Sequence, residues 1–318
     1  MLTLDTIRDA HARIRKDIIR TPVLSNETLD ADARASLFFK CESFQKIGAF
    51  KARGATNAVF LLTDEEAKRG VATHSSGNHA AAVARAAKLR GIPAYVVMPH
   101  TVPKAKLESV RSLGARIDIC EPTLAAREAA VQRIIAETGA QLIHPFNDYR
   151  VMAGQGTATL ELLDEQPDLD LILCPVGGGG LISGTVVAAK GLKPGIQVIG
   201  VEPAGADDAY RSFKSGAIVP VTVAHTIADG LRGTLLDKTF GVIRENVDDV
   251  VTVSEAAIIQ AMRSIWERLK IVVEPSAAVS YAAIVEKKVD VTGRRVGLIV
   301  TGGNLDLDSL PWNTTEVL

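Results

Sequence analysis

Short β-branched runs alternate with helical patterns along most of this chain, and no other feature restricts its fold as strongly. One block, from about residue 70 to 148, contains the runs VATHS, AYVVMP, ARIDIC and QLIHP. A second block contains LDLILCPV, QVIGVEP, DVVTVS and RVGLIVTGG. The segments between the runs carry apolar residues at helical spacing. This alternation predicts βαβ units, and therefore an α/β fold with open, mostly parallel sheets and helices on both faces.

The two blocks predict two lobes, because 318 residues exceed the usual size of one compact domain. The run SLFFKCE near the N-terminus resembles a further strand of the second sheet. We therefore expect a large domain made of residues 1–69 and 149–318, with a small domain, residues 70–148, inserted in it. Aromatic residues make up only 4%, so the core must consist of aliphatic side chains, as in buried parallel sheets.

Composition excludes several classes of protein. The chain has 36 basic and 37 acidic residues, so it lacks the positive field that a nucleic-acid partner requires. Three cysteines without a paired spacing favour a reducing compartment, and we expect a cytoplasmic protein. The segment MLTLDTIRDAHARIRK reads as an amphipathic helix rather than a signal peptide. The uncharged run 171–189 holds a proline and five glycines, so we expect no membrane helix.

The strongest local motif is a run of four glycines, Gly177, Gly178, Gly179 and Gly180, between an apolar strand and the helix that begins with Leu181. A tight strand-to-helix turn needs only one glycine. Four of them expose bare backbone amides at a helix N-terminus, which favours binding of a phosphate. A dinucleotide site is the rival interpretation, with Glu202 as the ribose-binding acid. It fails on spacing, because the third glycine of the G-x-G-x-x-G pattern is absent.

Three further motifs have both a functional and an ordinary structural interpretation. The segment SSGNHAAAVARAA, from residue 75 to 87, offers a carboxylate-binding loop or an ordinary helix cap. Lys51, between Phe50 and Ala52, is a Schiff-base lysine if it is desolvated and a surface residue if it is not. TGGN, at the end of the last strand, is a ligand-binding edge or a simple turn.

The motifs in their order resemble the serine racemase and serine/threonine dehydratase family, which includes threo-3-hydroxyaspartate dehydratases. They are ESFQKIGAFKARGA, THSSGNHAAAVA, HPFNDYRVMAGQGT, VGGGGLISG, GVEPAGADDAYRS, TIADGL and TGGNLDL. The resemblance runs from about residue 21 to 307. It implies the two-lobed, tryptophan-synthase-β-like fold of pyridoxal-phosphate enzymes, termed fold type II, and a homodimer.

The resemblance also implies roles for individual residues. Lys51 would form the Schiff base with pyridoxal 5′-phosphate. The remaining cofactor contacts would come from Phe50 beside the ring, Asn78 at the 3-hydroxyl, the four glycines with Leu181 at the phosphate, and Thr301 at the pyridine nitrogen. Ser75, Ser76, Asn78 and His79 would hold the carboxylate of a small amino-acid substrate. A divalent cation, Mg²⁺, Mn²⁺ or Ca²⁺, would bind Glu202, Ala206 and Asp208, which could equally be a strand end and a helix start.

The reaction that the resemblance implies is an ammonia-lyase reaction on L-serine, L-threonine or 3-hydroxyaspartate, in which the freed Lys51 amine removes the Cα proton. Ser76 is shared with racemases and with several hydroxyaspartate dehydratases, whereas typical threonine and serine dehydratases carry Ala. In the alternative, a serine racemase, Ser76 would be a second base. Phe146, where animal racemases usually carry Asn, resembles dehydratases instead. Arg150 is a surface charge or, if it reaches the pocket, a partner for a second substrate carboxylate. A non-catalytic protein that binds the cofactor or an amino acid is a remoter alternative.

Overall fold

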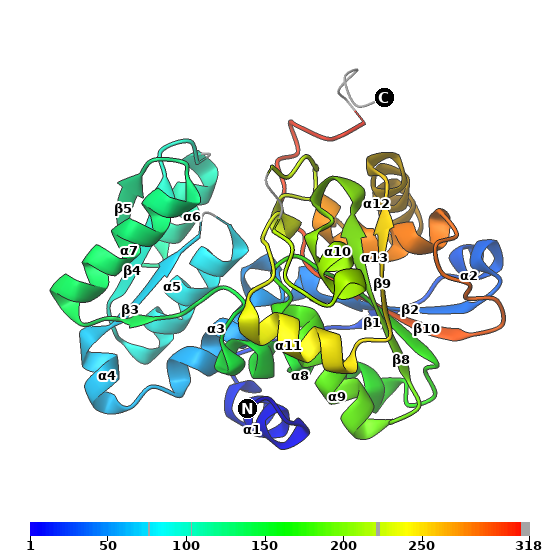
Figure 1. Cartoon of the computed structure of the whole chain (residues 1–318), viewed down its shortest axis with the longest axis horizontal. Coiled ribbons are helices and arrows are strands. Elements are labelled where there is room, and N and C mark those ends of the chain that lie inside the picture. Colours follow the sequence, from blue (N-terminus) through cyan, green and yellow to red (C-terminus); the bar gives the residue numbers. More distant parts are fainter. Residues whose placement is uncertain (76, 103, 221–222, 313–318) are drawn as a thin grey trace.

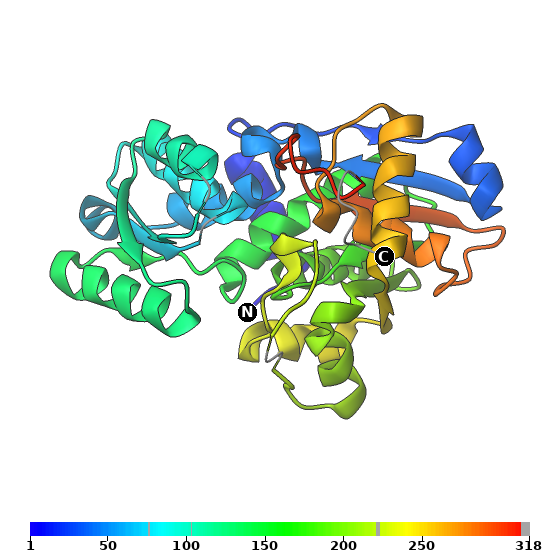
Figure 2. The ribbon, with the colours of Figure 1, turned by 90° about the horizontal axis from the view of Figure 1, so that it is seen from above.

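The computed structural model describes residues 1–75, 77–102, 104–220 and 223–312. The chain forms two lobes, each built around its own sheet (Figure 1). The view from above shows the same separation, with the smaller lobe, drawn in cyan and green, beside the larger one (Figure 2). Ser76, predicted as a second base and substrate-binding residue, lies outside the described residues.

The large sheet has six strands in the order β1-β2-β10-β7-β8-β9. Every neighbouring pair is parallel except β1 and β2. SLFFKCE is confirmed as a strand of this sheet, because β2 pairs with β10. The strands are β1 (Val23–Leu24), β2 (Ser36–Cys41), β7 (Leu171–Pro175), β8 (Gln197–Pro203), β9 (Asp249–Val253) and β10 (Arg295–Val300).

Both faces of the large sheet are buried, as expected for a continuous apolar strand. In β7, Leu171 and Leu173 face one hydrophobic cluster, whereas Ile172 and Cys174 face another. The first face is covered by α2 (Glu27–Ala33), α12 (Glu255–Leu269) and α13 (Pro275–Val285). The second is covered by α8 (Tyr149–Glu165), α9 (Gly180–Leu192), α10 (Asp208–Ser215) and α11 (Asp237–Asn246). Helix α1 (Leu4–Ile14) packs against α8.

The small sheet has four parallel strands in the order β5-β4-β3-β6. They are β3 (Val71–His74), β4 (Ala94–Pro99), β5 (Arg116–Cys120) and β6 (Gln141–Leu142). Its helices are α4 (Asp64–Arg69), α5 (Asn78–Arg90), α6 (Lys104–Ser112) and α7 (Leu124–Thr138). All four strands lie within the range predicted for the small domain. The limits 70 and 148 themselves remain a prediction.

Helix α3 (Lys51–Phe60) joins the lobes, since it packs against α5 on one side and α8 on the other. It approaches α8 at a contact between two glycines. A Cβ built on Gly154 would lie 2.6 Å from the Cα of Gly54, so no side chain fits at this crossing. The backbone of α3 is therefore held directly against α8, and the first residue of α3 is Lys51.

These observations confirm the predicted α/β fold class. The eight runs of the two blocks each contain a strand, and the sheets are mixed and mostly parallel with helices on both faces. No helix in the described ranges is long and apolar enough to cross a membrane. Cys41, Cys120 and Cys174 are free thiols.

Candidate active site

Lys51 is partly buried where the lobes meet. Its Nζ donates a hydrogen bond of 2.8 Å to the carbonyl oxygen of Pro145 and lies 5.1 Å from the centroid of the Phe50 ring. Burial lowers the pKa of the Lys51 amine to about 8, although the nearby carboxyl of Glu274 acts in the opposite direction. A buried amine with a lowered pKa is nucleophilic near neutral pH. The structure thus places Lys51 in the environment that a Schiff-base lysine requires.

Thr301 lies directly after β10 and contacts the segment that carries Lys51. Its carbonyl oxygen accepts a 3.0 Å hydrogen bond from the Phe50 N–H. Its side-chain Oγ1 is buried, with the residue only 3% exposed, and has no hydrogen-bond partner among the described residues. A buried hydroxyl without a partner is rare and costly. It would be satisfied by a ring nitrogen such as that of pyridoxal phosphate.

The four glycines form the turn between β7 and α9, with Gly179 in the left-handed region at φ 83°. The backbone N–H groups of Gly177, Gly178 and Gly179 donate no hydrogen bond to any residue that the structure describes. A Cβ on Gly178 would overlap the ring of Phe146, which lies against the turn. Free amides at the start of a helix suit a phosphate, and α9 continues directly from Gly180 and Leu181. The turn, Lys51 and Thr301 therefore fit the predicted cofactor.

Asn78 begins α5 and is clamped on both sides of its amide. Its Nδ2 donates to the two carboxyl oxygens of Glu274 at 3.0 and 3.2 Å, and its Oδ1 accepts from Asn304 at 2.8 Å. Sequence reasoning missed Glu274, which is 4% exposed. Burial, with the negative charge of Asp229, raises the pKa of the Glu274 carboxyl to about 7. The only sequence signal was an acid before a proline, which is typical of an ordinary helix start.

In the loop predicted to bind the substrate carboxylate, the side chain of His79 points into the protein interior. The imidazole of His79 is 2% exposed and its Nε2 lies 2.9 Å from the Ile143 carbonyl oxygen. Only the backbone of His79 therefore remains available for a substrate carboxylate. Ser75 keeps a polar role in the loop, because its Oγ accepts from the Gly77 N–H at 3.4 Å.

Arg150 binds its own helix start. Its guanidinium donates to both oxygens of Asp148, from Nε at 3.1 Å and from NH2 at 2.7 Å. The Asp148 carboxylate also accepts from the Arg150 N–H at the start of α8. In this arrangement the charge of Arg150 is paired with Asp148, which agrees with its interpretation as a charge without a substrate role.

The predicted cation ligands come together at the end of β8. Glu202 accepts hydrogen bonds from the Ala209 and Tyr210 N–H groups at 3.1 and 2.8 Å. Asp208 accepts one from Leu235 at 3.0 Å, and its second oxygen is buried without a partner. Burial raises the pKa of the Asp208 carboxyl to about 6, and burial with Asp208 raises that of Glu202 well above its usual value.

The two carboxyl groups alone do not make a cation site, so a hard cation would also need a backbone carbonyl oxygen as a ligand. Within the described ranges, no group of three or more His, Cys, Asp or Glu side chains is placed to hold a metal. Two carboxyls and the carbonyl of the buried Ala206, in η3 (Ala204–Ala206), would supply oxygen ligands of the kind that Mg²⁺, Mn²⁺ and Ca²⁺ prefer. The unpartnered Asp208 oxygen is the observation that favours such an ion.

Behind Lys51, four charged side chains form a closed cluster. Arg53 donates to Glu42 at 2.7 Å and to Glu161 at 2.7 Å, and Lys40 donates to Glu161 at 2.7 Å. All four side chains are essentially fully buried. The cluster is neutral overall and satisfies its own hydrogen bonds, which is the condition for burying charge without great cost. It anchors the first turn of α3.

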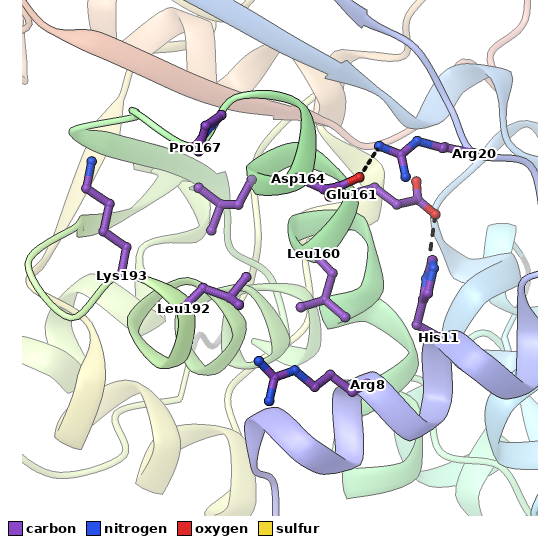
Figure 3. A pocket seen from close by; sticks show the side chains of 10 residues that line it. Arg8, His11, Arg20, Leu160, Glu161, Asp164, Pro167, Leu192 and Lys193 are labelled. Atoms are coloured by element: carbon purple, nitrogen blue, oxygen red, sulfur yellow. Dashed lines mark hydrogen bonds and ion pairs between the residues drawn. The ribbon is translucent and has the colours of Figure 1, made fainter.

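Glu161 also reaches a surface groove of about 510 Å³ between α1 and the ends of α8 and α9 (Figure 3). No predicted site residue lines this groove. Arg20 is paired with Asp164 at 2.8 Å, and His11 lies 3.9 Å from Glu161. The lining residues are Arg8, His11, Arg20, Leu160, Glu161, Leu163, Asp164, Pro167, Leu192 and Lys193.

Comparison with known proteins gives the same picture. Residues 14–302 match the family described as pyridoxal-phosphate dependent enzyme. The β-hydroxyaspartate dehydratase of Paracoccus denitrificans is 51% identical, covering 98% of this chain and 99% of that one. A serine racemase of Arabidopsis thaliana is 49% identical over 97% of this chain and 95% of its own. The structure of maize serine racemase superposes with a TM-score of 0.95 at 48% identity, covering 98% and 96%.

Proposed function

Because the chain belongs to the family of pyridoxal-phosphate dependent enzymes, we propose that it is an ammonia-lyase acting on a small 3-hydroxy amino acid. The products are a 2-keto acid and ammonia. The observation that carries the proposal is the buried Lys51 amine, placed at the same lobe interface as the free amides of the glycine turn and the unpartnered Thr301 hydroxyl.

When bound, pyridoxal phosphate supplies an aldehyde that amines attack and a ring that withdraws electrons from Cα of the substrate. The amine of Lys51 is the base for the Cα proton, since burial lowers its pKa to about 8 and so raises the fraction of neutral amine near neutral pH. Thr301 would hold the ring nitrogen through its hydroxyl, which carries no permanent charge. A hydroxyl stabilises negative charge on Cα less than a carboxylate partner would, which favours prompt loss of the β-hydroxyl.

The substrate is L-serine, L-threonine or 3-hydroxyaspartate. The elimination removes a proton from Cα and the hydroxyl group from Cβ, which together make one molecule of water. Hydrolysis of the released enamine consumes one water and yields the keto acid and ammonia. We put 3-hydroxyaspartate first among these, and the 51% identity to the Paracoccus β-hydroxyaspartate dehydratase supports this order. Its second carboxylate would need a cationic partner other than Arg150, because Arg150 is bound to Asp148.

Serine racemisation is the second candidate, supported by the 49% identity to the Arabidopsis serine racemase. Ser76 would return a proton to the face of Cα opposite Lys51. Ser76→Ala should abolish formation of D-serine and spare elimination from the L-substrate. D-serine formed at the wild-type rate by this variant would contradict a two-base racemase.

Further properties belong to the proposal. A divalent cation bound by Glu202, Asp208 and the Ala206 carbonyl would stabilise the end of β8, and its fit rests on the unpartnered Asp208 oxygen. A cytoplasmic homodimer agrees with the three free thiols and with the family resemblance.

The decisive experiment is a product assay of the protein loaded with pyridoxal phosphate and Mg²⁺. L-serine, L-threonine and the isomers of 3-hydroxyaspartate are supplied separately, and keto acid and D-serine are measured in parallel. Keto acid as the main product, abolished by Lys51→Ala, is expected. D-serine as the main product would make racemisation the main activity, and no turnover of any substrate would contradict both.

A further inference from the structure

Residues 144–147 lie in the loop between β6 and α8. This segment is the only described part of the chain that accepts a hydrogen bond from the Lys51 amine. The acceptor is the carbonyl oxygen of Pro145, at 2.8 Å, and the chain separates the two residues widely. Lys51 forms no ion pair with a described residue. The position of the free amine therefore depends on where this loop holds one carbonyl group.

His144 fixes the shape of that loop. Its Nδ1 accepts hydrogen bonds from the N–H groups of Asn147, at 2.9 Å, and Phe146, at 3.3 Å. Because Nδ1 accepts twice, it carries no proton. The imidazole also packs at right angles to the Phe146 ring, with centroids 4.7 Å apart, and to His74 at 5.9 Å. The peptide of Pro145 lies between these bonded groups, so the ring determines its orientation.

The far end of the loop is tied to the helix beside the glycine turn. The side-chain oxygen of Asn147 accepts from the N–H groups of Lys238 and Thr239 at 3.1 and 3.4 Å. Its Nδ2 donates to Asp237 at 2.8 Å. These three residues form the first turn of α11, and a Cβ on Gly179 would contact Thr239. One short loop thus connects Lys51 with the phosphate-binding turn.

The charge environment keeps His144 in the accepting form. Burial lowers the pKa of its imidazole to about 4, helped by His74 and Lys51. The groups that face it are His74 at the end of β3, Lys51 of α3, Asp148 at the start of α8 and Lys238 of α11. Only Asp148 favours the protonated ring. A proton on Nδ1 would break both loop hydrogen bonds and add a charge near the Lys51 amine.

We propose that His144 is a positioning residue for Lys51. Its imidazole fixes the 144–147 loop, and the Pro145 carbonyl oxygen of that loop holds the Lys51 amine in place whenever the amine is not bonded to the cofactor. The proposal rests on the proposed function only in naming Lys51 as the reacting amine. In it, the Pro145 carbonyl oxygen contacts the amine directly, and His144 acts by holding that carbonyl group in position.

Two substitutions separate hydrogen bonding from packing. His144→Asn retains an acceptor, because the Asn Oδ1 occupies about the place of the imidazole Nδ1. His144→Phe retains an aromatic ring and removes the acceptor. The measured quantity is the rate at which cofactor-free protein forms its bond with pyridoxal phosphate, followed by absorbance from pH 6 to 9. No amino-acid substrate is present, so failure of the lyase assay and failure of this proposal are distinguishable.

We expect His144→Phe to slow this bond formation about tenfold and to shift the midpoint of its pH profile, as loss of about one hydrogen bond predicts. His144→Asn should stay within about threefold of wild type at an unchanged midpoint. Wild-type kinetics in the Phe variant, or equal loss in both variants, would overturn the proposal. If the Phe variant does not fold, nitrogen NMR of histidine-labelled wild type decides the matter, since a proton on Nδ1 of His144 at pH 7 contradicts it.

Discussion

The backbone N–H of Phe50 donates a 3.0 Å hydrogen bond to the carbonyl oxygen of Thr301. This bond joins the residue before Lys51 to the residue after the last strand of the large sheet. The Lys51 amine, proposed to attack the cofactor, and the Thr301 hydroxyl, proposed to meet its ring, are thus linked through one backbone contact. A shift of α3 would move both groups together, which keeps their separation constant.

Replacing Thr301 by Val tests the unpartnered hydroxyl, because valine has the same shape without the Oγ1. In cofactor-free protein the change should leave stability unaltered or raise it by up to about 1 kcal/mol, since a buried hydroxyl without a partner disappears. Affinity for pyridoxal phosphate should fall about fivefold. Denaturant unfolding and a cofactor titration measure the two effects. Unchanged cofactor affinity would show that the hydroxyl does not meet the ring.

Substituting Gly178 by Ala should weaken cofactor binding by about tenfold or more, because the new Cβ overlaps the Phe146 ring and one of them must move. Gly195→Ala is the matched control, since a Cβ there meets nothing within 4 Å. Adding Phe146→Ala to the Gly178 variant should restore part of the affinity. The idea is wrong if the single variant binds the cofactor as tightly as the control.

Glu274 predicts a pH effect of definite sign. Its folded-state pKa, about 7, is raised above the unfolded value, so its contribution to stability is complete below about pH 4.5 and is lost as the pH rises to about 7. Glu274→Gln imitates the protonated form. Cofactor-free variant and wild type should unfold alike near pH 4.5, and the variant should be more stable above pH 7 by on the order of 2–3 kcal/mol.

The two proteins are compared by urea unfolding at several pH values. Histidines titrate in both proteins, so their contribution cancels in the difference between the two free energies of unfolding. Glu267→Gln, on the exposed side of α12, serves as the control and should show no such trend. If the free energy of unfolding differed between wild type and Glu274→Gln by the same amount at every pH, titration of the buried carboxyl would not be the cause of the difference.

Asp208→Asn tests the cation. Added Mg²⁺, Mn²⁺ or Ca²⁺ should raise the Tm of metal-stripped wild type by several degrees, because an ion that binds only the folded state stabilises it. The variant should not respond, since its second side-chain group is no longer a carboxylate oxygen. Asp207→Asn, whose carboxylate pairs with Arg211 at 2.8 Å, is the control. Equal responses of all three proteins would exclude this site.

Sequence patterns predicted the parts of the molecule that are local. Alternating residues such as Leu171 and Ile172 indicate a strand buried on both faces, and they face different clusters as expected. The glycine turn was recognised because its chemistry is contained in consecutive residues. Its Gly179 adopts a positive φ, as only the backbone of glycine does without strain.

Side-chain contacts between distant segments could not be predicted, although the pairing of SLFFKCE with the second sheet was. Nothing near Lys51 in the sequence points to the Pro145 carbonyl, and nothing near Asn78 points to Glu274. His79 was expected in the loop that holds the substrate carboxylate, and nothing in the sequence indicates that its imidazole packs inward, with Nε2 2.9 Å from the Ile143 carbonyl oxygen. A motif identifies the residues of a loop, whereas the direction of each side chain depends on which distant segment packs against it.

The pairing of β2 with β10 has a consequence for synthesis of the chain. Strand β2 is synthesised long before its parallel neighbour β10. The four strands of the small sheet are complete by residue 142 and need no later segment for their pairing. The small lobe is therefore able to fold first, while the apolar β2 has no partner on its β10 side until that strand has been made, which leaves an open strand edge prone to aggregation during synthesis.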